Sequence, residues 1–337
     1  MLEYRGEIVI VSSKDVAKLA GVSQTTVSRV LNTPDLVKAT TVNKVLKAIE
    51  QLNYIPNEQA RLLVTSRTNT IALLSGPLHN PFFSDTTAAI VNYANSKGYK
   101  VDVQFVQDEE LEHAYSKILE RKVDGIILSC ILYEDPFFER LKRLDIPFIT
   151  FNRKHQSNEN FVEIDNEQAG YIAAQALQAV GHQHIAYVGG HLTVSTYANR
   201  FKGALCALGE AVSEKYIYHS NTTRTSISEG VDHLLQQSTL PTAIIGASDS
   251  IALNVIDELL KHNIRIPEDI SVMGIDNVEL AAYEQIQLTT VGHETEKNLG
   301  LIAITELIEM IENKKNSCVR ITESVKLFNR KTVKHLK

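Results

Sequence analysis

The sequence predicts an α/β protein in which a small helical head precedes a larger body built on parallel sheets. Residues 12–56 hold only short amphipathic stretches with a helical spacing of apolar residues. From residue 70 onward, apolar runs typical of buried strands alternate with helical stretches, a pattern that indicates parallel sheets with crossover connections. About 270 residues of such alternation exceed one open sheet, so we expect two α/β lobes.

The head begins with a predicted helix after Ser12. The Ser12 hydroxyl stands three residues before the Asp15 carboxylate, which is the spacing of a capping box. Gly21 offers the left-handed conformation that ends such a helix. Ser23 can then cap a second helix. Because only residues 21–23 separate the two helices, the spacing predicts a helix-turn-helix.

A third head helix is predicted after a break at residues 32–35, which read Asn-Thr-Pro-Asp. Val42, Val45 and Ile49 fall on one apolar stripe of this helix, and residues 53–57 end it. Strands of the body are predicted at residues 71–74, 101–106, 125–128, 148–151, 185–188, 243–246 and 270–275. Helices are predicted between them, at residues 88–96, 110–121, 167–180 and 251–262.

The composition excludes several classes of protein. The chain has 337 residues, a formal net charge of −6 and 44% hydrophobic residues, so it can build a sizeable core. Three scattered cysteines exclude a disulfide scaffold and a zinc ribbon, and they fit a reducing cytosol. No stretch approaches ~18 consecutive apolar residues, and the apolar run at 8–11 is too short for a signal sequence. We therefore expect a cytoplasmic protein without membrane contact.

Charge is distributed unevenly along the chain. Residues 14–67 hold eight Lys and Arg against four Asp and Glu, although the whole chain is acidic. A basic head suggests an anionic partner at one end, unless the excess is a chance fluctuation. Arg and Gln side chains can bond guanine and adenine edges, and Thr can contact a thymine methyl group. The second helix presents a polar face that includes such side chains. In the alternative interpretation, this face is exposed to solvent and binds nothing. Its residues are Gln24, Thr25, Ser28, Arg29 and Asn32.

Catalytic and metal-binding motifs are absent from the sequence. It contains no nucleophile elbow, no phosphate-binding loop with Gly-Lys-Ser/Thr and no cysteine pair at metal spacing. His182 and His184 stand close together, but nearby histidines of this kind are more often polar residues at a helix end. Gly189 and Gly190 after a strand give only a weak nucleotide signal. We therefore expect neither an enzyme nor a cofactor or metal ion.

The head residues 15–32, 53–57 and 60–63 are followed along the chain by ordered landmarks at 80–83, 123–127, 165–170, 181–182, 267–270, 274–276 and 330–332. Together these segments carry a resemblance to the lac repressor (LacI/GalR) family of bacterial transcription regulators. It implies a head over 12–56, a hinge helix over 57–68 and a sensor over 69–337 that is similar to periplasmic binding proteins and dimerises. The implied N-lobe covers about 69–164 plus 293–322, and the C-lobe covers 165–292 plus 323–337.

The resemblance also implies which head residues contact operator DNA. They are Ser23, Gln24, Thr25, Thr26, Ser28, Arg29, Asn32, Tyr54, Asn57, Ala60 and Leu63. Leu63 falls where the family inserts a leucine into the minor groove and kinks the duplex, although it could be a linker leucine packed on the sensor. Lys38 replaces a common capping serine and Val42 a common basic residue. Family heads begin just before residue 13, so we expect translation to start at Val9 or Val11.

In the sensor, polar and aromatic residues at strand ends are expected to converge on the crevice between the lobes. The expected effector ligands are Phe82, Phe83, Asn152, Arg153, Arg200, Ser248, Asp249 and Asp276. Each also has an ordinary interpretation, as a core ring, a surface ion pair or, for Asp249, a helix cap. Ser248 stands where the family usually has Asn, and Asn152 where Asp is frequent, so the ligand preference is expected to differ.

These observations predict a homodimeric repressor of a carbohydrate-utilisation operon. Two recognition helices would read a near-palindromic operator, and a sugar or sugar phosphate between the lobes would bias operator affinity. Three alternatives remain open at this point. The ligand could be a corepressor, the regulator could respond to another metabolite or a partner protein, or the chain could be a sugar-binding protein that does not bind DNA.

Overall fold

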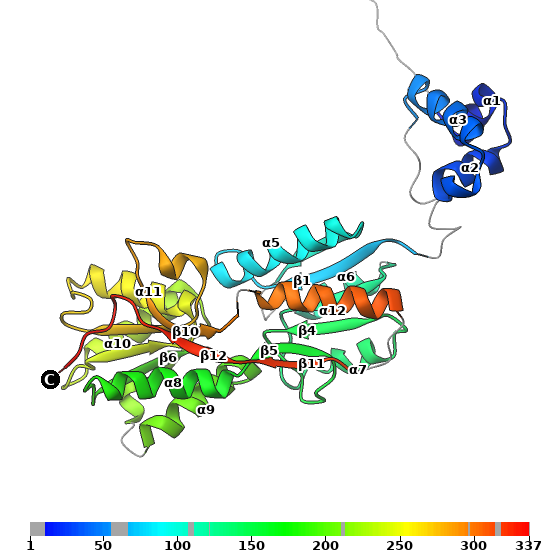
Figure 1. Ribbon diagram of the computed structural model, residues 1–337. Helices are drawn as coiled ribbons and strands as arrows, with labels where there is room; N and C mark the ends of the chain where they lie inside the picture. The colour runs from blue at the N-terminus through cyan, green and yellow to red at the C-terminus, as the bar shows by residue number, and fades with distance from the viewer. Residues whose placement is uncertain are drawn as a thin grey trace, which may run out of the picture. The chain divides into compact units, whose positions relative to one another are not determined.

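The computed structural model in Figure 1 describes residues 11–54, 67–106, 111–120, 122–209, 213–295, 297–313 and 318–336. The chain divides at residue 68 into two compact units. The first unit is a helical head and the second is a body with two six-stranded sheets. The predicted fold class, a helix-turn-helix head with an α/β body of parallel sheets, is confirmed.

Three helices form the head around a core of small apolar side chains. They are α1 (Ser13–Ala20), α2 (Gln24–Asn32) and α3 (Ala39–Gln51), with a short 3-10 helix at Pro34–Leu36. The small side chains let the three helices approach closely, which places α2 across the turn from α1. The buried core residues are Val16, Ala17, Val27, Val30, Val45 and Ala48.

The predicted helix starts and stops of the head follow from local hydrogen bonds. The Ser12 backbone N–H and hydroxyl donate to Asp15 Oδ2 at 2.9 and 2.7 Å, and Gly21 ends α1 with a φ of 66°. Ser23 Oγ accepts from the Thr26 N–H at 3.1 Å and caps α2. Lys38 precedes α3 and makes no side-chain cap hydrogen bond, so the capping contact of a serine is missing at this helix start.

One lobe of the body, the N-lobe, contains the sheet ordered β11-β5-β4-β3-β1-β2, with all pairs parallel. Its strands are β1 (Thr70–Ser75), β2 (Lys100–Phe105), β3 (Gly125–Leu128), β4 (Phe148–Phe151), β5 (Phe161–Ile164) and β11 (Arg320–Glu323). Ile71 and Leu73 face α5 (Pro81–Ser96) and α12 (Leu299–Asn313). Ala72 and Leu74 alternate with them and face α6 (Leu111–Leu119) and α7 (Phe137–Lys142).

The other lobe, the C-lobe, contains the sheet ordered β12-β10-β9-β8-β6-β7, in which only β12 is antiparallel. Its strands are β6 (Ile185–Gly189), β7 (Ile217–His219), β8 (Ala243–Gly246), β9 (Ser271–Asp276), β10 (Thr289–His293) and β12 (Val325–Phe328). Helices α8 and α9 cover one face, and α10 and α11 cover the other (Figure 1). They span Asn166–Ala179, Ser195–Leu208, Arg224–Leu235 and Asp249–Lys261.

The chain passes between the lobes after β5, after β10 and after β11. Backbone hydrogen bonds join these crossover segments. The Asp165 N–H donates to the Glu323 carbonyl at 2.9 Å, and the Glu294 N–H donates to the Ser324 carbonyl at 3.2 Å. Because the parallel strands of both sheets end on the side of the crossovers, their following residues are brought to the crevice between the lobes.

Candidate effector cleft and DNA-reading surface

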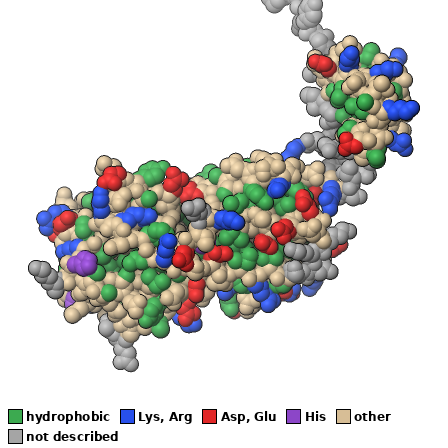
Figure 2. Space-filling model, in the orientation of Figure 1, with side chains coloured by type: hydrophobic (Ala, Val, Ile, Leu, Met, Phe, Trp, Pro, Cys, Tyr) green, Lys and Arg blue, Asp and Glu red, His purple; other side chains and the backbone are tan. Residues whose placement is uncertain are grey.

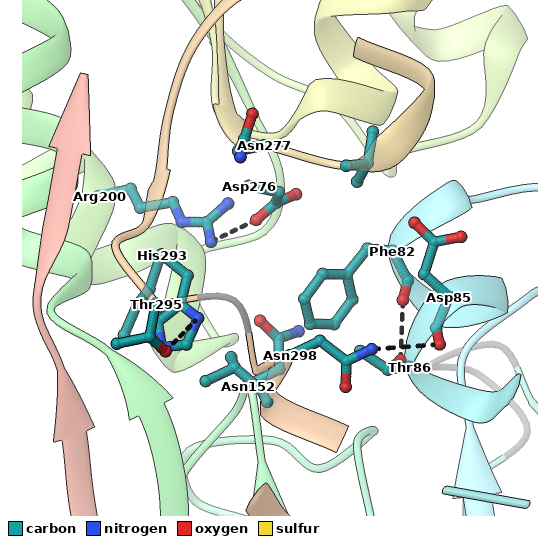
Figure 3. Close-up of a pocket in the computed structure, with 13 residues that line it drawn as sticks. Phe82, Asp85, Thr86, Asn152, Arg200, Asp276, Asn277, His293, Thr295 and Asn298 are labelled. Carbon is teal, nitrogen blue, oxygen red and sulfur yellow. Dashed lines mark hydrogen bonds and ion pairs between the residues drawn. The ribbon is translucent and has the colours of Figure 1, made fainter. Parts of the chain in front are cut away.

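Side chains from both lobes surround a cavity of about 250 Å³ at the carboxyl ends of the strands. Asn152 follows β4, Asp276 ends β9 and His293 ends β10. Figure 3 shows the Phe82 ring pointing into this space from α5, toward the side on which Arg200 and Asp276 lie. The other described lining residues are Asp85, Thr86, Ile164, Asn277, Val278, Thr295, Asn298 and Leu299.

Arg200 is held in the C-lobe wall of this cavity by three directed hydrogen bonds. Its Nε donates to Asn166 Oδ1 at 2.8 Å, and its Nη1 donates to the Ala247 carbonyl at 2.7 Å. Its Nη2 donates to Asp276 Oδ1 at 2.6 Å, which forms a buried ion pair (Figure 3). A guanidinium has five N–H groups, so two remain for a ligand in the cavity that Arg200 lines.

The backbone of the cavity wall is strained at three places. Asn152, Asp276 and Asn277 have φ values of 65°, 140° and 55°. Asn tolerates positive φ better than most residues, whereas the φ of Asp276 lies in a region that favours glycine. Such conformations cost of order 1–3 kcal/mol each and cluster at ligand sites. The strain therefore supports a ligand-binding role for this edge of the cleft.

Burial shifts the pKa of two C-lobe carboxylates, Asp276 in the cavity wall and the nearby Asp249. It raises the pKa of Asp276, and the Arg200 charge opposes this shift. Burial and then the Asp276 charge raise the pKa of Asp249 to about 7. Asp249 accepts hydrogen bonds from the Val278 N–H at 2.9 Å and from the Thr290 hydroxyl at 2.5 Å. It is fully buried and does not line the cavity, so its expected ligand contact lacks support.

The structure brings four of the expected effector ligands, Phe82, Asn152, Arg200 and Asp276, to the cavity. The remaining candidates, Phe83, Arg153 and Ser248, line an adjoining narrow space of about 20 Å³. Ser248 Oγ also accepts from the Ile251 N–H at 3.2 Å, so Ser248, rather than Asp249, caps α11. Arg200 lies inside α9 as the sixth residue of the helix.

Several cavity residues escape prediction from the sequence. Asp85 lies one helical turn after Phe82 on α5, a spacing that would have indicated the same face. Burial raises the pKa of Asp85, and its Oδ2 accepts a long hydrogen bond of 3.5 Å from the Glu279 N–H of the other lobe. Asn298 donates to the Asp85 carbonyl at 3.4 Å (Figure 3). His293 could have been found from its place at a strand end.

In the head, α2 exposes the face that the sequence predicts. Gln24, Thr25 and Arg29 are exposed, whereas Val27 and Val30 are buried on the opposite side. Thr26 and Ser28 are half-buried, and Ser23 is exposed at the cap. Figure 2 shows more Lys and Arg than Asp and Glu on the visible face of the head. This helix can therefore present its polar side chains to an anionic surface.

Other expected DNA contacts differ in their surroundings or lie outside the described residues. Tyr54 is half-buried and packs against the head core. Asn32 is the last residue of α2, but its side chain is outside the described part of the structure. The hinge residues Asn57, Ala60 and Leu63, and the expected start at Val9, also lie outside it.

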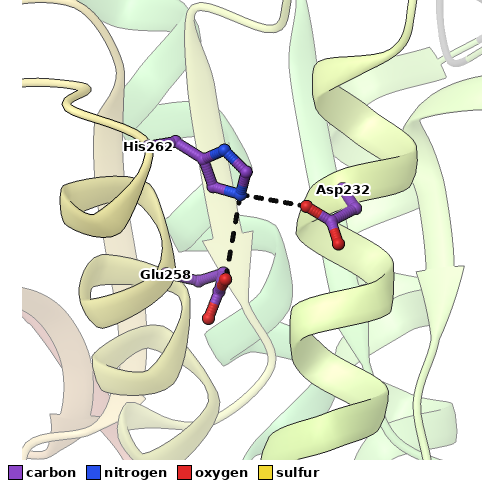
Figure 4. A group of neighbouring side chains, drawn as sticks. All are labelled: Asp232, Glu258 and His262. Carbon is purple, nitrogen blue, oxygen red and sulfur yellow. Dashed lines mark ion pairs between the residues drawn. The ribbon is translucent and has the colours of Figure 1, made fainter.

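Polar clusters away from the cleft have ordinary structural partners. Among the described residues, Asp232, Glu258 and His262 bring ligand atoms within 4.8 Å of one another on α10 and α11 (Figure 4). His262 Nε2 lies 3.0 Å from Asp232 Oδ1, and Lys261 Nζ lies 2.8 Å from Glu258 Oε2, so a network of surface ion pairs accounts for the group. His182 is buried, and its Nε2 lies 3.2 Å from the Lys334 carbonyl oxygen.

Comparison with known proteins assigns both parts of the chain. A model of the bacterial regulatory proteins of the lacI family matches residues 13–57, and a periplasmic binding protein-like domain matches residues 174–333. The HTH-type transcriptional repressor PurR of Vibrio atlanticus (strain LGP32) is 36% identical over 330 residues, which cover 96% of this chain and 98% of that protein. The chain belongs to the LacI family.

Solved structures of LacI-family members cover nearly the whole chain. The lac repressor dimer bound to operator and the anti-inducer ONPF has 28% identity and a TM-score of 0.82, covering 96% of this chain and 98% of that chain. The transcriptional regulator CelR in complex with cellobiose has 27% identity and a TM-score of 0.70, covering 96% and 99%. This LacI-family chain is therefore a DNA-binding transcriptional repressor regulated by a small-molecule effector, and not an enzyme.

No helix among the described residues of this LacI-family chain is long and apolar enough to cross a membrane.

Proposed function

We propose that this LacI-family chain is a cytoplasmic homodimeric repressor whose operator affinity is switched by a carbohydrate bound between its lobes. The observation that carries the proposal is the composition of the 250 Å³ cavity. It sets the Phe82 ring against a wall formed by the Arg200–Asp276 pair. Charged and amide groups can bond several hydroxyls at once, and an aromatic ring covers the apolar face of a sugar.

The amide side chains of the cavity strengthen this choice. Asn152, Asn277 and Asn298 line it together with Asp85, so both donors and acceptors surround the space. Phe82 is the only Phe, Tyr or Trp side chain among the described residues that line it. A flat nitrogen base is held best when stacked between rings, whereas a polyhydroxylated ligand needs many hydrogen bonds and one ring face. The wall therefore favours a sugar or sugar phosphate over a flat base.

The head supports reading of a near-palindromic operator by two copies of α2. Its exposed Gln24, Thr25 and Arg29 are the side-chain types that recognise base edges and thymine methyl groups. A two-fold symmetric dimer places two recognition helices in successive major grooves, which demands two related half-sites. Binding is expected to fall steeply with salt, because neutralised phosphates release their counterions.

The test begins by selecting operator sequences from random DNA with the purified full chain. Operator affinity is then measured by fluorescence anisotropy with neutral mono- and disaccharides, hexose phosphates and, as flat ligands, adenine and guanine. At least one carbohydrate is expected to change the affinity, and Phe82→Ala is expected to abolish that change while leaving ligand-free DNA binding intact. A response to the bases alone would refute the carbohydrate assignment, and selection of non-symmetric DNA would contradict the dimer.

A further inference from the structure

A buried carboxylate, that of Glu163 on β5, is linked to Arg200 through two hydrogen bonds and does not itself line the first cavity. Glu163 is 3% exposed, and its two oxygens have different partners. Lys154 Nζ donates to Oε1 at 2.5 Å, and Asn166 Nδ2 donates to Oε2 at 3.3 Å. Burial raises the pKa of Glu163, and the hydrogen bond and charge of Lys154 oppose this shift. The buried charge therefore depends on both donors.

The amide of Asn166 joins this carboxylate to Arg200. Its Nδ2 donates to Glu163 Oε2 and also to the Ile164 carbonyl, at 3.1 Å, whereas its Oδ1 accepts from Arg200 Nε at 2.8 Å. A guanidinium only donates and an ionised carboxylate only accepts, so an amide that bonds both has a single orientation. Asn166 and Arg200 are both buried, so water has little access to these contacts.

Lys154 connects the same group to the start of α9. It follows β4 of the N-lobe, and its backbone N–H donates to Ser195 Oγ at 2.9 Å. Ser195 is the first residue of α9, the helix that carries Arg200. Lys154 thus contacts Glu163 through its side chain and α9 through its backbone. The Lys154–Glu163 pair therefore reaches Arg200 by two separate routes, one through Asn166 and one through the start of its own helix.

We propose that Glu163, paired with Lys154, is a positioning residue of the effector site, which fixes the orientation of the Asn166 amide and, through it, the Arg200 guanidinium. The inference rests on the proposed function in taking the cavity lined by Arg200 as the effector site. An ordered guanidinium presents its two remaining N–H groups in a fixed direction. A ligand then binds to donors that do not have to be ordered on binding.

Loss of the carboxylate weakens the hold on this amide. Both Nη atoms of Arg200 are bonded within the C-lobe, so its Nε contact with Asn166 is the one that leads back to Glu163. Glu163→Gln keeps the shape of the side chain, but one end of an amide is a donor. The variant must therefore lose the contact with Lys154 or the contact with Asn166. In the second case only the bond to the Ile164 carbonyl is left to oppose a reversed amide, which would set its Nδ2 against the Arg200 Nε–H.

The decisive experiment observes the Nε–H group of Arg200 by heteronuclear NMR of arginine side chains in the full chain. The signal is assigned by its absence from Arg200→Lys. In the parent it is expected to exchange slowly with solvent, because the donor is buried and bonded. Glu163→Gln is expected to shift the signal and to speed its exchange by about tenfold, which corresponds to the loss of one hydrogen bond of a charged group.

Glu167→Gln is the matched control, since Glu167 lies beside Asn166 in α8 and pairs with Lys202 at the exposed surface. It should leave the Arg200 signal unchanged. If Glu163→Gln fails to fold, Lys154→Met carries the test, because it takes one of the two donors from Glu163. It is expected to shift the signal, and Lys154→Arg to return it toward the parent. A signal that the folded variant leaves unchanged, or that Glu167→Gln shifts equally, would overturn the positioning role.

A second arm measures the effector response and separates this inference from the carbohydrate assignment. Operator affinity is measured with glucose, galactose, cellobiose, glucose 6-phosphate, adenine and guanine. A compound that acts on the parent is expected to need about two- to tenfold higher concentration with Glu163→Gln, and an unchanged concentration with Glu167→Gln.

The outcomes of this arm are distinct. Equal concentrations for the parent and Glu163→Gln would refute the positioning role and leave the carbohydrate assignment intact. A response to adenine or guanine alone would refute the carbohydrate assignment, while the comparison with Glu163→Gln still tests the positioning role. If none of the compounds acts, the carbohydrate assignment loses its support, and the Arg200 signal alone decides for or against Glu163.

Discussion

His293 Nε2 lies 3.1 Å from Glu323 Oε2, where two of the crossover segments pass between the lobes. His293 ends β10 and lines the effector cavity, whereas Glu323 ends β11 of the other sheet. The Thr295 hydroxyl lies 3.2 Å from the same imidazole nitrogen (Figure 3). The two partners belong to different sheets, so the pair joins the two lobes beside the crossovers. The pair thus connects the wall of the candidate effector cavity to the crossovers.

Glu323→Gln is expected to reduce the response to effector without abolishing DNA binding. The substitution keeps the shape of the side chain but replaces the carboxylate with an amide, and a partly exposed polar contact of this kind contributes about 1 kcal/mol or less. The ratio of operator affinities with and without effector should therefore change by up to about fivefold. Fluorescence anisotropy on operator DNA measures this ratio. Lys202→Gln, which breaks an exposed pair with Glu167 on the C-lobe surface, is the control, and an equal effect there would contradict the coupling role.

Arg200→Ala is expected to destabilise the body strongly. It leaves the Ala247 carbonyl and the Asp276 carboxylate buried without their donor. Removing one partner of a buried ion pair costs about 3–5 kcal/mol. Urea unfolding followed by circular dichroism measures the loss. Arg200→Lys should fall between the parent and Arg200→Ala, because lysine restores the charge but not the fork of donors. A free energy of unfolding equal to that of the parent would show that the network is dispensable.

Arg29→Ala is expected to weaken binding to the selected operator by about 1–3 kcal/mol and to relax the preference at one base pair in each half-site. The Arg29 side chain is exposed on α2, so the head core should remain intact. Binding to the operator and to random DNA is compared, with circular dichroism to verify the helices. Lys14→Ala, on an exposed position of α1, tests the loss of a charge alone. An equal loss on operator and random DNA would mean that Arg29 contacts phosphate only.

Local sequence patterns predict much of this fold. The run 125–128 coincides with β3, and the run 148–151 with β4, because short, mostly apolar runs between turns are typical of strands buried on both faces. The edge strand β12 shows no such run, since half of it faces solvent, and its antiparallel pairing with β10 depends on a crossover far along the chain. Patterns within one segment carry no information about such pairings.

Prediction of the candidate site is limited for a similar reason. Phe82 and Phe83 are neighbours in sequence, yet the Phe82 ring enters the first cavity while Phe83 is buried beside the narrow space. Successive residues of α5 point about 100° apart around the helix axis. The sequence alone does not show which of the two rings faces the cavity, because it does not fix where the helix begins. Asp249 stands at the start of a helix, but the partners that bury it, Val278 and Thr290, come from distant segments.

Asp249→Asn is expected to make the stability of the body less sensitive to rising pH. Burial and the Asp276 charge raise the pKa of Asp249 from 3.8 to about 7 in the folded protein. Below about pH 4 the carboxyl is protonated in both states and contributes no pH dependence. Between about pH 4 and pH 7 unfolding releases a proton, so the free energy of unfolding falls as the pH rises, by at most about 4 kcal/mol in total. Above about pH 7 the free energy of unfolding stays lower by this full amount.

An asparagine at this position can keep both contacts of Asp249. Its amide oxygen can accept from the Val278 N–H, and its amide nitrogen can donate to the Thr290 hydroxyl. Since asparagine does not titrate, the part of the pH dependence that belongs to Asp249 should vanish, and the part due to Asp276, whose pKa is also raised, should remain. Urea unfolding of parent and variant across this pH range measures both. Parallel profiles for the two proteins would show that Asp249 is ionised throughout, and that its burial is compensated by the nearby Arg200 charge.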